Sequence, residues 1–255
     1  GLMALLMRTQ LAVPEADVLS PEFYNQMFTM HGTLMMFMFV VPMLEGLAVY
    51  LTPLQVGARD MPMPRLNVFG YFAYVFGGIF LLTSFLVGHA PDGGWYAYVP
   101  FTGAQFSPDL RMDFWLLGVT LVEISGIVAA IEIVVLVIRC RAPGMTLARM
   151  PAFTWASLVT SIMILAAFPL LVAASTMLEL ERKLGFFFYD PTGGGDPLLW
   201  QHLFWWFGHP EVYIQLIPGL GMAAAIVTAA AGRRMAGRTA VIASIVAIGI
   251  LSFGL

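Results

Sequence analysis

The sequence predicts an all-α protein, a polytopic bundle of transmembrane helices. Composition is the first reason, because 60% of the 255 residues are hydrophobic and only 11% are charged, which is typical of integral membrane proteins. Long apolar segments are the second reason, since several approach or exceed the ~20 residues that a helix needs to cross a bilayer. The third reason is that most basic residues fall in alternate connections between these segments, as they do in cytoplasmic loops.

Six apolar segments are predicted to cross the membrane. They are residues 28–51, 67–88, 112–138, 151–178, 198–231 and 239–255. Residues 1–7 look like the end of an earlier helix, and no internal repeat divides the chain, so we expect 1–255 to form a single transmembrane domain. The span 151–178 has no charged residue, which favours a structural role. Because the last span stops without a polar tail and the first residue is not Met, we expect the chain to be a fragment of a larger protein.

Basic residues orient the predicted spans. Eight of the twelve lie in three alternate connections, which we expect to be cytoplasmic. These eight are Arg59, Arg65, Arg139, Arg141, Arg149, Arg233, Arg234 and Arg238. Residues 10–24, 89–110 and 179–197 should then face outward. The pattern is that of membrane orientation, and it contains no patch suited to binding nucleic acid.

The segment 201–213, Gln-His-Leu-Phe-Trp-Trp-Phe-Gly-His-Pro-Glu-Val-Tyr, is the main candidate for a functional site. Ionisable residues inside an apolar span are costly unless they bind or pair with something. On a helix, His209 and Tyr213 share one face, whereas Glu211 points to another side. Pro210 lacks an N–H, so the helix should kink there. A lone histidine in an apolar helix is more often a hydrogen-bonded packing residue than a metal ligand, so the spacing alone leaves both roles open.

Four strings together resemble one known family. Residues 205–213, Trp-Trp-Phe-Gly-His-Pro-Glu-Val-Tyr, resemble the helix VI signature of subunit I of the heme-copper oxygen reductases, the cytochrome c and quinol oxidases. Residues 29–37, Thr-Met-His-Gly-Thr-Leu-Met-Met-Phe, resemble its helix II motif, in which Gly32 leaves room for a flat partner close to the backbone. Residues 141–146 and 188–197 resemble two of its loops. The resemblance implies part of the family's 12-helix fold, from the end of helix I to the start of helix VII.

The same resemblance implies an activity. The chain would belong to the catalytic subunit of a terminal respiratory oxidase, which reduces O2 to water with electrons from cytochrome c or quinol and takes up and pumps protons. The implied cofactors are a low-spin heme and a high-spin heme, each of A or O type, and copper. The implied partners are subunits II and III and membrane lipid, with the bacterial plasma membrane favoured over the mitochondrial inner membrane. Because the family's further histidine ligands lie on later helices, we do not expect these 255 residues to be active alone.

The resemblance also implies roles for cofactor-binding residues. The helix II histidine of the family is an axial ligand of low-spin heme iron, which assigns that role to His31. The helix VI motif assigns copper to His209, and makes Tyr213, crosslinked to it, the donor of an electron and a proton during O–O cleavage. Trp205 would pack at this site. Arg8 would approach a heme, although an arginine there is equally suited to the membrane interface.

A proton path is implied as well. Glu211 would pass protons inward to the site. Asp60 stands where A-type oxidases take up protons, and Asn67 falls in the matching polar channel. Ser125 belongs to the same path. Carboxyl groups inside an apolar span can hold or relay protons, which suits them to this work.

The chain departs from the family's pattern along this path. The family commonly has an asparagine near the position of Glu132. The carboxyl groups of Glu132, Glu45 and Glu123 are unusual additions to the family's pattern. We therefore expect the route from Asp60 toward Glu211 to run partly through Glu45 or Glu132. The efficiency of proton pumping stays open on this evidence.

Two alternative functions remain. One is a nitric oxide reductase of the same superfamily, although those enzymes generally lack the tyrosine found here at 213. The other is a non-heme, proton-coupled transporter or structural subunit, in which His209 and Glu211 relay protons without a redox metal. Heme and copper in the full protein would separate the oxidase from both.

Overall fold

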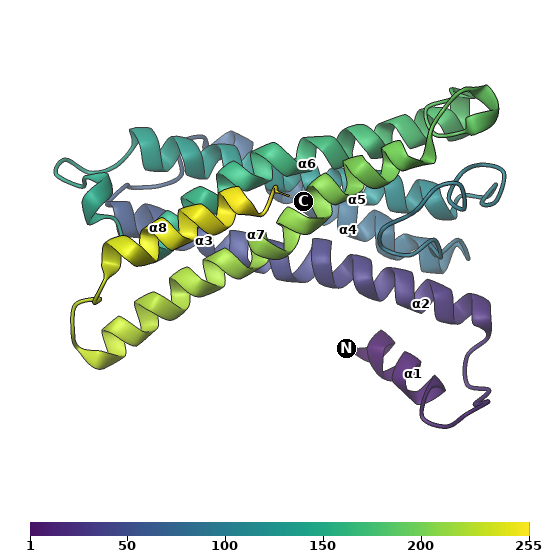
Figure 1. The fold of residues 1–255 in the computed structure, drawn as a ribbon, viewed down its shortest axis with the longest axis horizontal. Coiled ribbons are helices and arrows are strands. Elements are labelled where there is room, and N and C mark those ends of the chain that lie inside the picture. The colour runs from purple at the N-terminus through teal and green to yellow at the C-terminus, as the bar shows by residue number, and fades with distance from the viewer. Residues whose placement is uncertain (255) are drawn as a thin grey trace. The chain divides into compact units, whose positions relative to one another are not determined.

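Helices joined by irregular connections make up the fold of residues 1–254, the part of the chain that the computed structural model describes (Figure 1). The α-helices are α1 (Leu2–Gln10), α2 (Pro21–Thr33), α3 (Val41–Val56), α4 (Pro64–Leu86), α5 (Arg111–Arg139), α6 (Ala152–Leu184), α7 (Pro197–Ala231) and α8 (Arg238–Leu251). Three short elements complete the order: the π-helix η1 (Leu34–Val40) and the 3₁₀ helices η2 (Leu147–Arg149) and η3 (Pro191–Gly193). No strand occurs among these residues, which confirms the predicted all-α class.

Five helical stretches are long and apolar enough to cross a membrane. They are Pro21–Val56, Pro64–Leu86, Arg111–Arg139, Ala152–Leu184 and Pro197–Ala231. The first is continuous because η1 joins α2 to α3 without interruption. The predicted sixth span, 239–255, is shorter, because α8 ends at Leu251 after 14 residues; its predicted last residue, Leu255, lies outside the described residues. A helix of that length rises only about 21 Å.

The helix α6 continues beyond its predicted end. The sequence analysis assigns 179–184 to an outward-facing connection, but these residues form the last turns of α6. They contain neither proline nor glycine, and the helix ends where Gly185 adopts a left-handed φ of 72°, a conformation that glycine reaches at little cost. The extension is held by Asp113 of α5, whose carboxylate lies 3.1 Å from Arg182 and 2.5 Å from Lys183.

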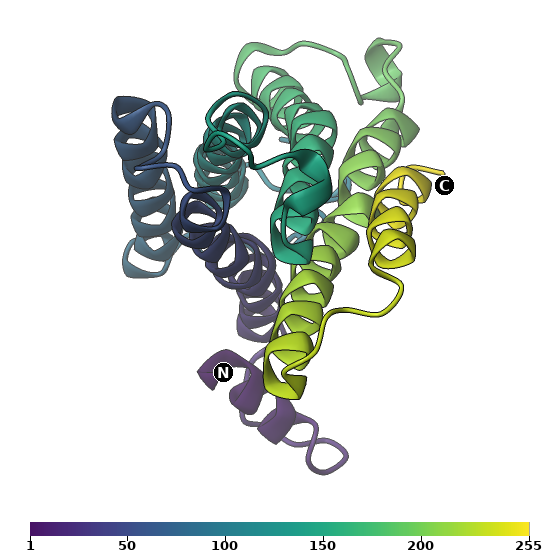
Figure 2. The ribbon, with the colours of Figure 1, turned by 90° about the vertical axis from the view of Figure 1, so that its left-hand side faces the viewer.

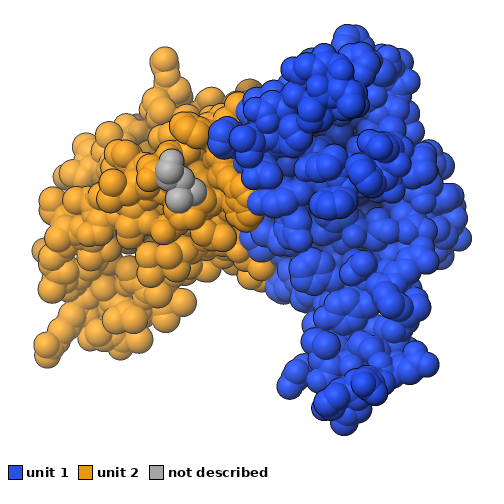
Figure 3. All heavy atoms as spheres, turned by 45° about the vertical axis from the view of Figure 1, so that its right-hand side comes forward, with its two compact units in different colours: residues 1–39, 74–122, 172–204 blue, residues 40–73, 123–171, 205–255 orange. Residues whose placement is uncertain are grey.

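The chain divides into two compact units, coloured separately in Figure 3. Unit 1 comprises Gly1–Phe39, Tyr74–Val122 and Val172–Phe204, and unit 2 comprises Val40–Ala73, Glu123–Leu171 and Trp205–Leu255. The expectation of a single transmembrane domain over 1–255 stays a prediction.

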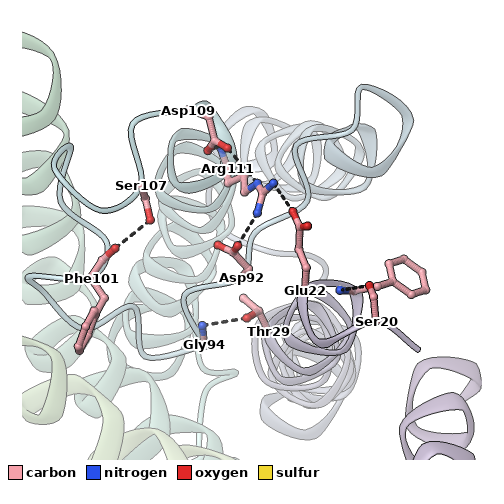
Figure 4. Close-up of polar contacts among 10 residues, drawn as sticks. Ser20, Glu22, Thr29, Asp92, Gly94, Phe101, Ser107, Asp109 and Arg111 are labelled. Atoms are coloured by element: carbon pink, nitrogen blue, oxygen red, sulfur yellow. Dashed lines mark hydrogen bonds and ion pairs between the residues drawn. The ribbon is translucent and has the colours of Figure 1, made fainter. Parts of the chain in front are cut away.

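Unit 1 contains the connections predicted to face outward, and polar contacts fasten one of them to helix ends (Figure 4). The guanidinium of Arg111, the first residue of α5, lies 2.5 Å from the Glu22 carboxylate on α2 and 2.6 Å from that of Asp92, in the loop after α4. The N–H of Gly94 in the same loop donates to the Thr29 hydroxyl at 2.8 Å. These contacts bring the loop to α2, at Glu22 and Thr29, and to the start of α5.

Arg182 of α6 holds the other end of the same loop. Its side chain is only 2% exposed. The guanidinium donates to the carbonyls of Thr102, Ser107 and Asp109 at 2.7, 2.8 and 2.9 Å, and to the Asp113 carboxylate at 3.1 Å. A buried guanidinium is tolerated when its donors are paired in this way. A charged side chain of a helix therefore helps to fix the loop.

Unit 2 contains the three connections that carry most of the basic residues, and these connections contact one another. The N–H of Ala142 donates to the Val56 carbonyl at 2.9 Å. The guanidinium of Arg238 donates to the Ala148 carbonyl at 2.5 Å and to the Met150 carbonyl. Loops on one side of a membrane are expected to lie together in this way, which agrees with the predicted grouping. The identity of that side stays a prediction.

Helix α8, drawn in yellow beside α7 in Figure 2, packs closely on α6 through Gly249 in unit 2. A Cβ added to Gly249 would lie 2.6 Å from Cγ1 of Val159 and 3.2 Å from Sδ of Met163. The two helices can approach this closely because glycine has no side chain at the crossing. This packing positions the turn that follows α8.

Candidate functional site

The rings of His209 and Tyr213 lie side by side on α7. Their centroids are 4.9 Å apart and their planes meet at 73°, an edge-to-face arrangement. Because α7 continues through Pro210, residues four positions apart remain neighbours on one face. Both side chains belong to half-buried residues. The helix thus holds an imidazole and a phenol in contact within about one turn.

The turn after α8 orients His209. Nδ1 of His209 lies 2.8 Å from the carbonyl oxygen of Ser252. A carbonyl only accepts hydrogen bonds, so Nδ1 carries the hydrogen and Nε2 keeps its lone pair. A neutral imidazole fixed by a second hydrogen bond is the usual form of a metal-binding histidine. The described residues contain no group of three or more His, Cys, Asp or Glu side chains able to hold a metal, so within them His209 would be one ligand of a site rather than a whole site.

Three carboxyl groups cluster in unit 2 near the middle of α7. Glu211 is fully buried; its Oε1 accepts from Nε2 of Gln215 at 3.3 Å, and its Oε2 has no hydrogen-bond partner among the described residues. The carboxyls of Glu45 on α3 and Glu123 on α5 lie close enough to interact electrostatically with it. No cation pairs with any of the three in the described part of the chain. An unpaired carboxylate is costly in apolar surroundings, so these carboxyl groups favour the protonated form. They are therefore suited to hold and carry protons.

A second carboxyl pair lies at the end of unit 2 that bears the basic connections. Asp60 is exposed, whereas Glu132 is buried and accepts from the N–H of Met63 at 3.2 Å. The two carboxyls are near enough to interact electrostatically. Asn67 on α4 and Ser125 on α5 are half-buried in the same unit, and within residues 1–254 neither makes a side-chain hydrogen bond to this pair. The fold therefore places the exposed Asp60 near the buried Glu132. Among the described residues it does not link this pair by hydrogen bonds to Asn67 or Ser125.

His31 lies on α2 in unit 1 and is half-buried. Its ring makes no hydrogen bond to any described residue, so both ring nitrogens are available, one for a metal and one for an acceptor. The flat partner expected at Gly32 is part of the chain itself: a Cβ at this position would lie 3.0 to 3.1 Å from three side-chain atoms of Trp95. The loop after α4 therefore supplies a flat group, the indole of Trp95, at Gly32.

The other predicted cofactor residues, Arg8 and Trp205, are both at least partly open to the surface. Arg8 is exposed on α1 in unit 1, and Trp205 is 37% exposed on α7 in unit 2. The described residues enclose neither side chain. Their expected packing against a heme and against the copper site stays a prediction.

Sequence reasoning missed a group of buried hydroxyls on α6. They belong to Thr154, Ser157, Thr160 and Ser161, which are 0%, 2%, 8% and 1% exposed. The span 151–178 contains no charged residue, so its charge pattern does not point to them. The signal that was available is the spacing, because residues three and four apart lie on one face of a helix.

The family is decided by the match of the whole chain. The family model described as "Cytochrome C and Quinol oxidase polypeptide I" matches residues 1–255. The chain belongs to this family. Membership confirms the resemblance drawn from the His-Pro-Glu-Val-Tyr string, and with the five apolar helices it identifies the chain as an integral membrane protein.

Curated relatives agree with membership of the cytochrome c and quinol oxidase polypeptide I family. "Cytochrome c oxidase subunit 1" of Corynebacterium glutamicum is 46% identical over 253 residues, which cover 99% of this chain and 43% of that protein. The protein of the same name from Corynebacterium efficiens is 44% identical, with 99% and 43% covered. "Quinol oxidase subunit 1" of Bacillus spizizenii is 40% identical, with 99% and 39% covered. The chain spans less than half the length of these relatives.

Proposed function

We propose that this chain forms part of the catalytic subunit of a terminal respiratory oxidase, which reduces O2 to water in a bacterial plasma membrane. The observation that carries the proposal is the contact between the rings of His209 and Tyr213, 4.9 Å apart on a helix that also buries Glu211. A metal ligand, a phenol and a proton-carrying acid then lie within five residues. Electrons would come from cytochrome c or a quinol, and subunits II and III would be the partner chains.

The proposed cofactors are a low-spin heme, a high-spin heme and copper, the hemes being of A or O type. His31 would hold the low-spin heme iron, with Arg8 beside that heme. His209 would be one copper ligand, with Trp205 packing at the site. A neutral imidazole is a suitable ligand for both metals. When bound, these groups supply electron transfer and the binding and reduction of O2, which amino-acid side chains do not provide.

The residues around the copper position have separate tasks. The Ser252 carbonyl holds His209 through Nδ1, so the imidazole is oriented before a metal binds. The ring of Tyr213 is held edge-to-face with that imidazole, and its phenol can give up one electron together with one proton. Glu211, buried one half-turn away, can hold a proton at its unpartnered Oε2 and deliver it toward the site.

Proton supply is the part of the proposal in which this chain differs from its family. Asp60 is the exposed acid at the uptake end, with Asn67 and Ser125 in the same unit, and Glu132 is the buried acid beside it. Glu45 lies near Glu211 at the other end of the route. We infer that these two additional carboxyls carry protons that the family's asparagine-lined path would otherwise carry.

Spectra and metal analysis of the full-length protein with its partner subunits test the function. Reduced-minus-oxidised difference spectra should contain the bands of two hemes, and the preparation should contain copper. Tyr213→Phe should abolish oxygen consumption while heme and copper content stay unchanged. The matched control is Tyr71→Phe, at a residue 62% exposed on α4, which should leave turnover unchanged. Non-heme iron in place of copper would indicate a nitric oxide reductase, and a protein without heme bands would indicate a transporter.

Proton translocation in vesicles tests the modified route. Glu132→Gln and Glu45→Gln each keep the size of the side chain but replace the carboxyl, which can take up and release a proton, with an amide that does not ionise. Each should lower the number of protons released per electron. Unchanged turnover and unchanged pumping in both variants would eliminate the role of the two carboxyls and leave the oxidase assignment intact.

A further inference from the structure

A small cavity lies against Glu45 in unit 2. Its volume is about 20 Å³, and residues of α3, α5, α6 and α7 line it. Most of the lining is apolar, but four polar side chains reach it: Glu45, Ser157, Thr160 and Ser161. A water molecule needs roughly 10–15 Å³ of such volume, together with two to four polar partners. The cavity has room for one water.

The polar atoms around the cavity can bind that water. Oε1 of Glu45 and Oγ1 of Thr160 are buried and have no hydrogen-bond partner among the described residues. The Ser157 hydroxyl donates to the Phe153 carbonyl at 2.9 Å, and the Ser161 hydroxyl donates to the Ser157 carbonyl at 2.8 Å. Both serine oxygens therefore keep lone pairs that can accept. A water here would satisfy two orphaned atoms and gain acceptors for its own hydrogens.

The polar lining continues along α6 toward the end of α3. Thr154 is fully buried, and its hydroxyl donates to Oε1 of Gln55 at 2.6 Å. Gln55 is half-buried and stands two residues before Gly57, the C-cap of α3. Thr154, Ser157 and Ser161 are spaced by three and four residues, so they share one face over a rise of about 10 Å. We call this set, Gln55, Thr154, Ser157, Thr160 and Ser161, the α3–α6 polar seam.

We propose that the α3–α6 polar seam holds a single water against Glu45 and conducts protons to it. The proposal rests on the proposed function, and it adds a branch that does not begin at Asp60. Each proton that reaches Glu45 through the seam releases one proton from the Glu45 carboxyl to the neighbouring carboxylate of Glu211, so Glu45 is left neutral. Hydroxyls and water conduct by accepting a proton on one side and releasing one on the other. The alternative is that the α6 hydroxyls only satisfy backbone carbonyls of their own helix.

The contacts of Asp60 favour a separate branch. Within the described residues Asp60 interacts electrostatically with Glu132. Oε1 of Glu132 already accepts a hydrogen bond from the Met63 N–H. Among residues 1–254 no hydrogen bond joins Glu132 to Glu45. The hydroxyls of α6, by contrast, line the same cavity as the Glu45 carboxyl.

Infrared spectroscopy of the complete enzyme in its membrane tests the water site. A protonated Glu45 should give a carboxyl C=O band that disappears in Glu45→Gln. Thr160→Val keeps the shape of the side chain but removes a partner of the water, so it should move this band to higher wavenumber. Thr160→Ser restores a hydroxyl and should restore the position. If Glu45→Gln removes no carboxyl band, or if Thr160→Val leaves the band in place, the water site is refuted.

Deuterium exchange of the same band tests the route. After transfer to D2O, Thr154→Val should slow exchange at Glu45 by roughly fivefold, as expected for the loss of one hydrogen bond from the path. Asp60→Asn should slow this exchange less than Thr154→Val does, because the seam does not begin at Asp60. The matched control is Thr176→Val on the same helix, where an exposed hydroxyl bonds only to the Val172 carbonyl; it should have no effect. If Asp60→Asn slows exchange at Glu45 and Thr154→Val does not, the proposed route through the seam is refuted.

Different measurements would refute this proposal and the proposed function. The heme bands and oxygen consumption of the unaltered enzyme report the function alone. The band position and its exchange rate report the seam alone, and the heme content of each variant reports whether it has folded.

Discussion

Replacing Arg182 with methionine should release the loop between α4 and α5. The guanidinium is 2% exposed and makes four hydrogen bonds, three to loop carbonyls and one to Asp113, whose side chain is 8% exposed. Removing one member of a buried ion pair costs about 3–5 kcal/mol, because the other charge and its acceptors lose their partner. Lys183 remains close to the Asp113 carboxylate, which places the expected effect toward the lower end of that range.

Hydrogen exchange of the full protein measures this effect locally. The N–H groups of Gly103 and Ser107 are bonded within the loop at 2.9 Å each and should be protected in the unaltered chain. In Arg182→Met their exchange should accelerate by roughly two to four orders of magnitude, the equivalent of 3–5 kcal/mol. The control is Arg111→Met, which removes a 22% exposed arginine whose partners Glu22, Asp92 and Asp109 are 60%, 24% and 35% exposed; because water screens these pairs, the loss there should be smaller, about 1 kcal/mol. Equal effects in both variants, or unchanged exchange in Arg182→Met, would refute the reasoning.

Three smaller predictions concern packing and pH. Gly249→Leu should destabilise the contact of α8 with α6 by about 1–3 kcal/mol and lower copper content, because it displaces the carbonyl that holds His209; metal analysis checks this. Gly219→Ala lies in a helix interior, where the added Cβ would meet no described atom within 4 Å outside the helix's own backbone and its chain neighbours; it should instead raise the free energy of unfolding by up to about 1 kcal/mol. Burial and the neighbouring Glu181 raise the pKa of the Tyr189 phenol above its usual range, so the folded state binds this proton more tightly and stability should fall as pH rises above about 10. Tyr189→Phe should remove that alkaline loss in pH-dependent melting, and should cost about 1 kcal/mol at neutral pH through the bond to the Ala174 carbonyl.

Features set by local spacing could be predicted from the sequence. The contact between His209 and Tyr213 follows from a separation of four residues on a helix, which needs no knowledge of the rest of the fold. Most of the apolar spans follow from their length and composition. The sharing of one unit by the basic connections follows from their alternation along the chain.

Features that join distant parts of the chain could not be predicted in this way. The Glu45, Glu123 and Glu211 carboxyls come from three helices, and no pattern within any one helix indicates that they meet. Trp95 fills the space above Gly32 because a loop returns to α2, which the motif around Gly32 does not encode. The α6 hydroxyls were overlooked for a different reason, since serine and threonine on an apolar helix usually satisfy carbonyls of their own backbone.

The partner of His209 is a peptide carbonyl, and this has a consequence for genetic studies of the site. Every residue type at position 252 would present the same oxygen, so alanine scanning there would leave the imidazole's partner in place. Sequence variation at that position would be equally uninformative. What matters is the course of the main chain at the end of α8, and changes that redirect it, such as a bulky residue at a helix crossing, are the ones that would reveal its importance.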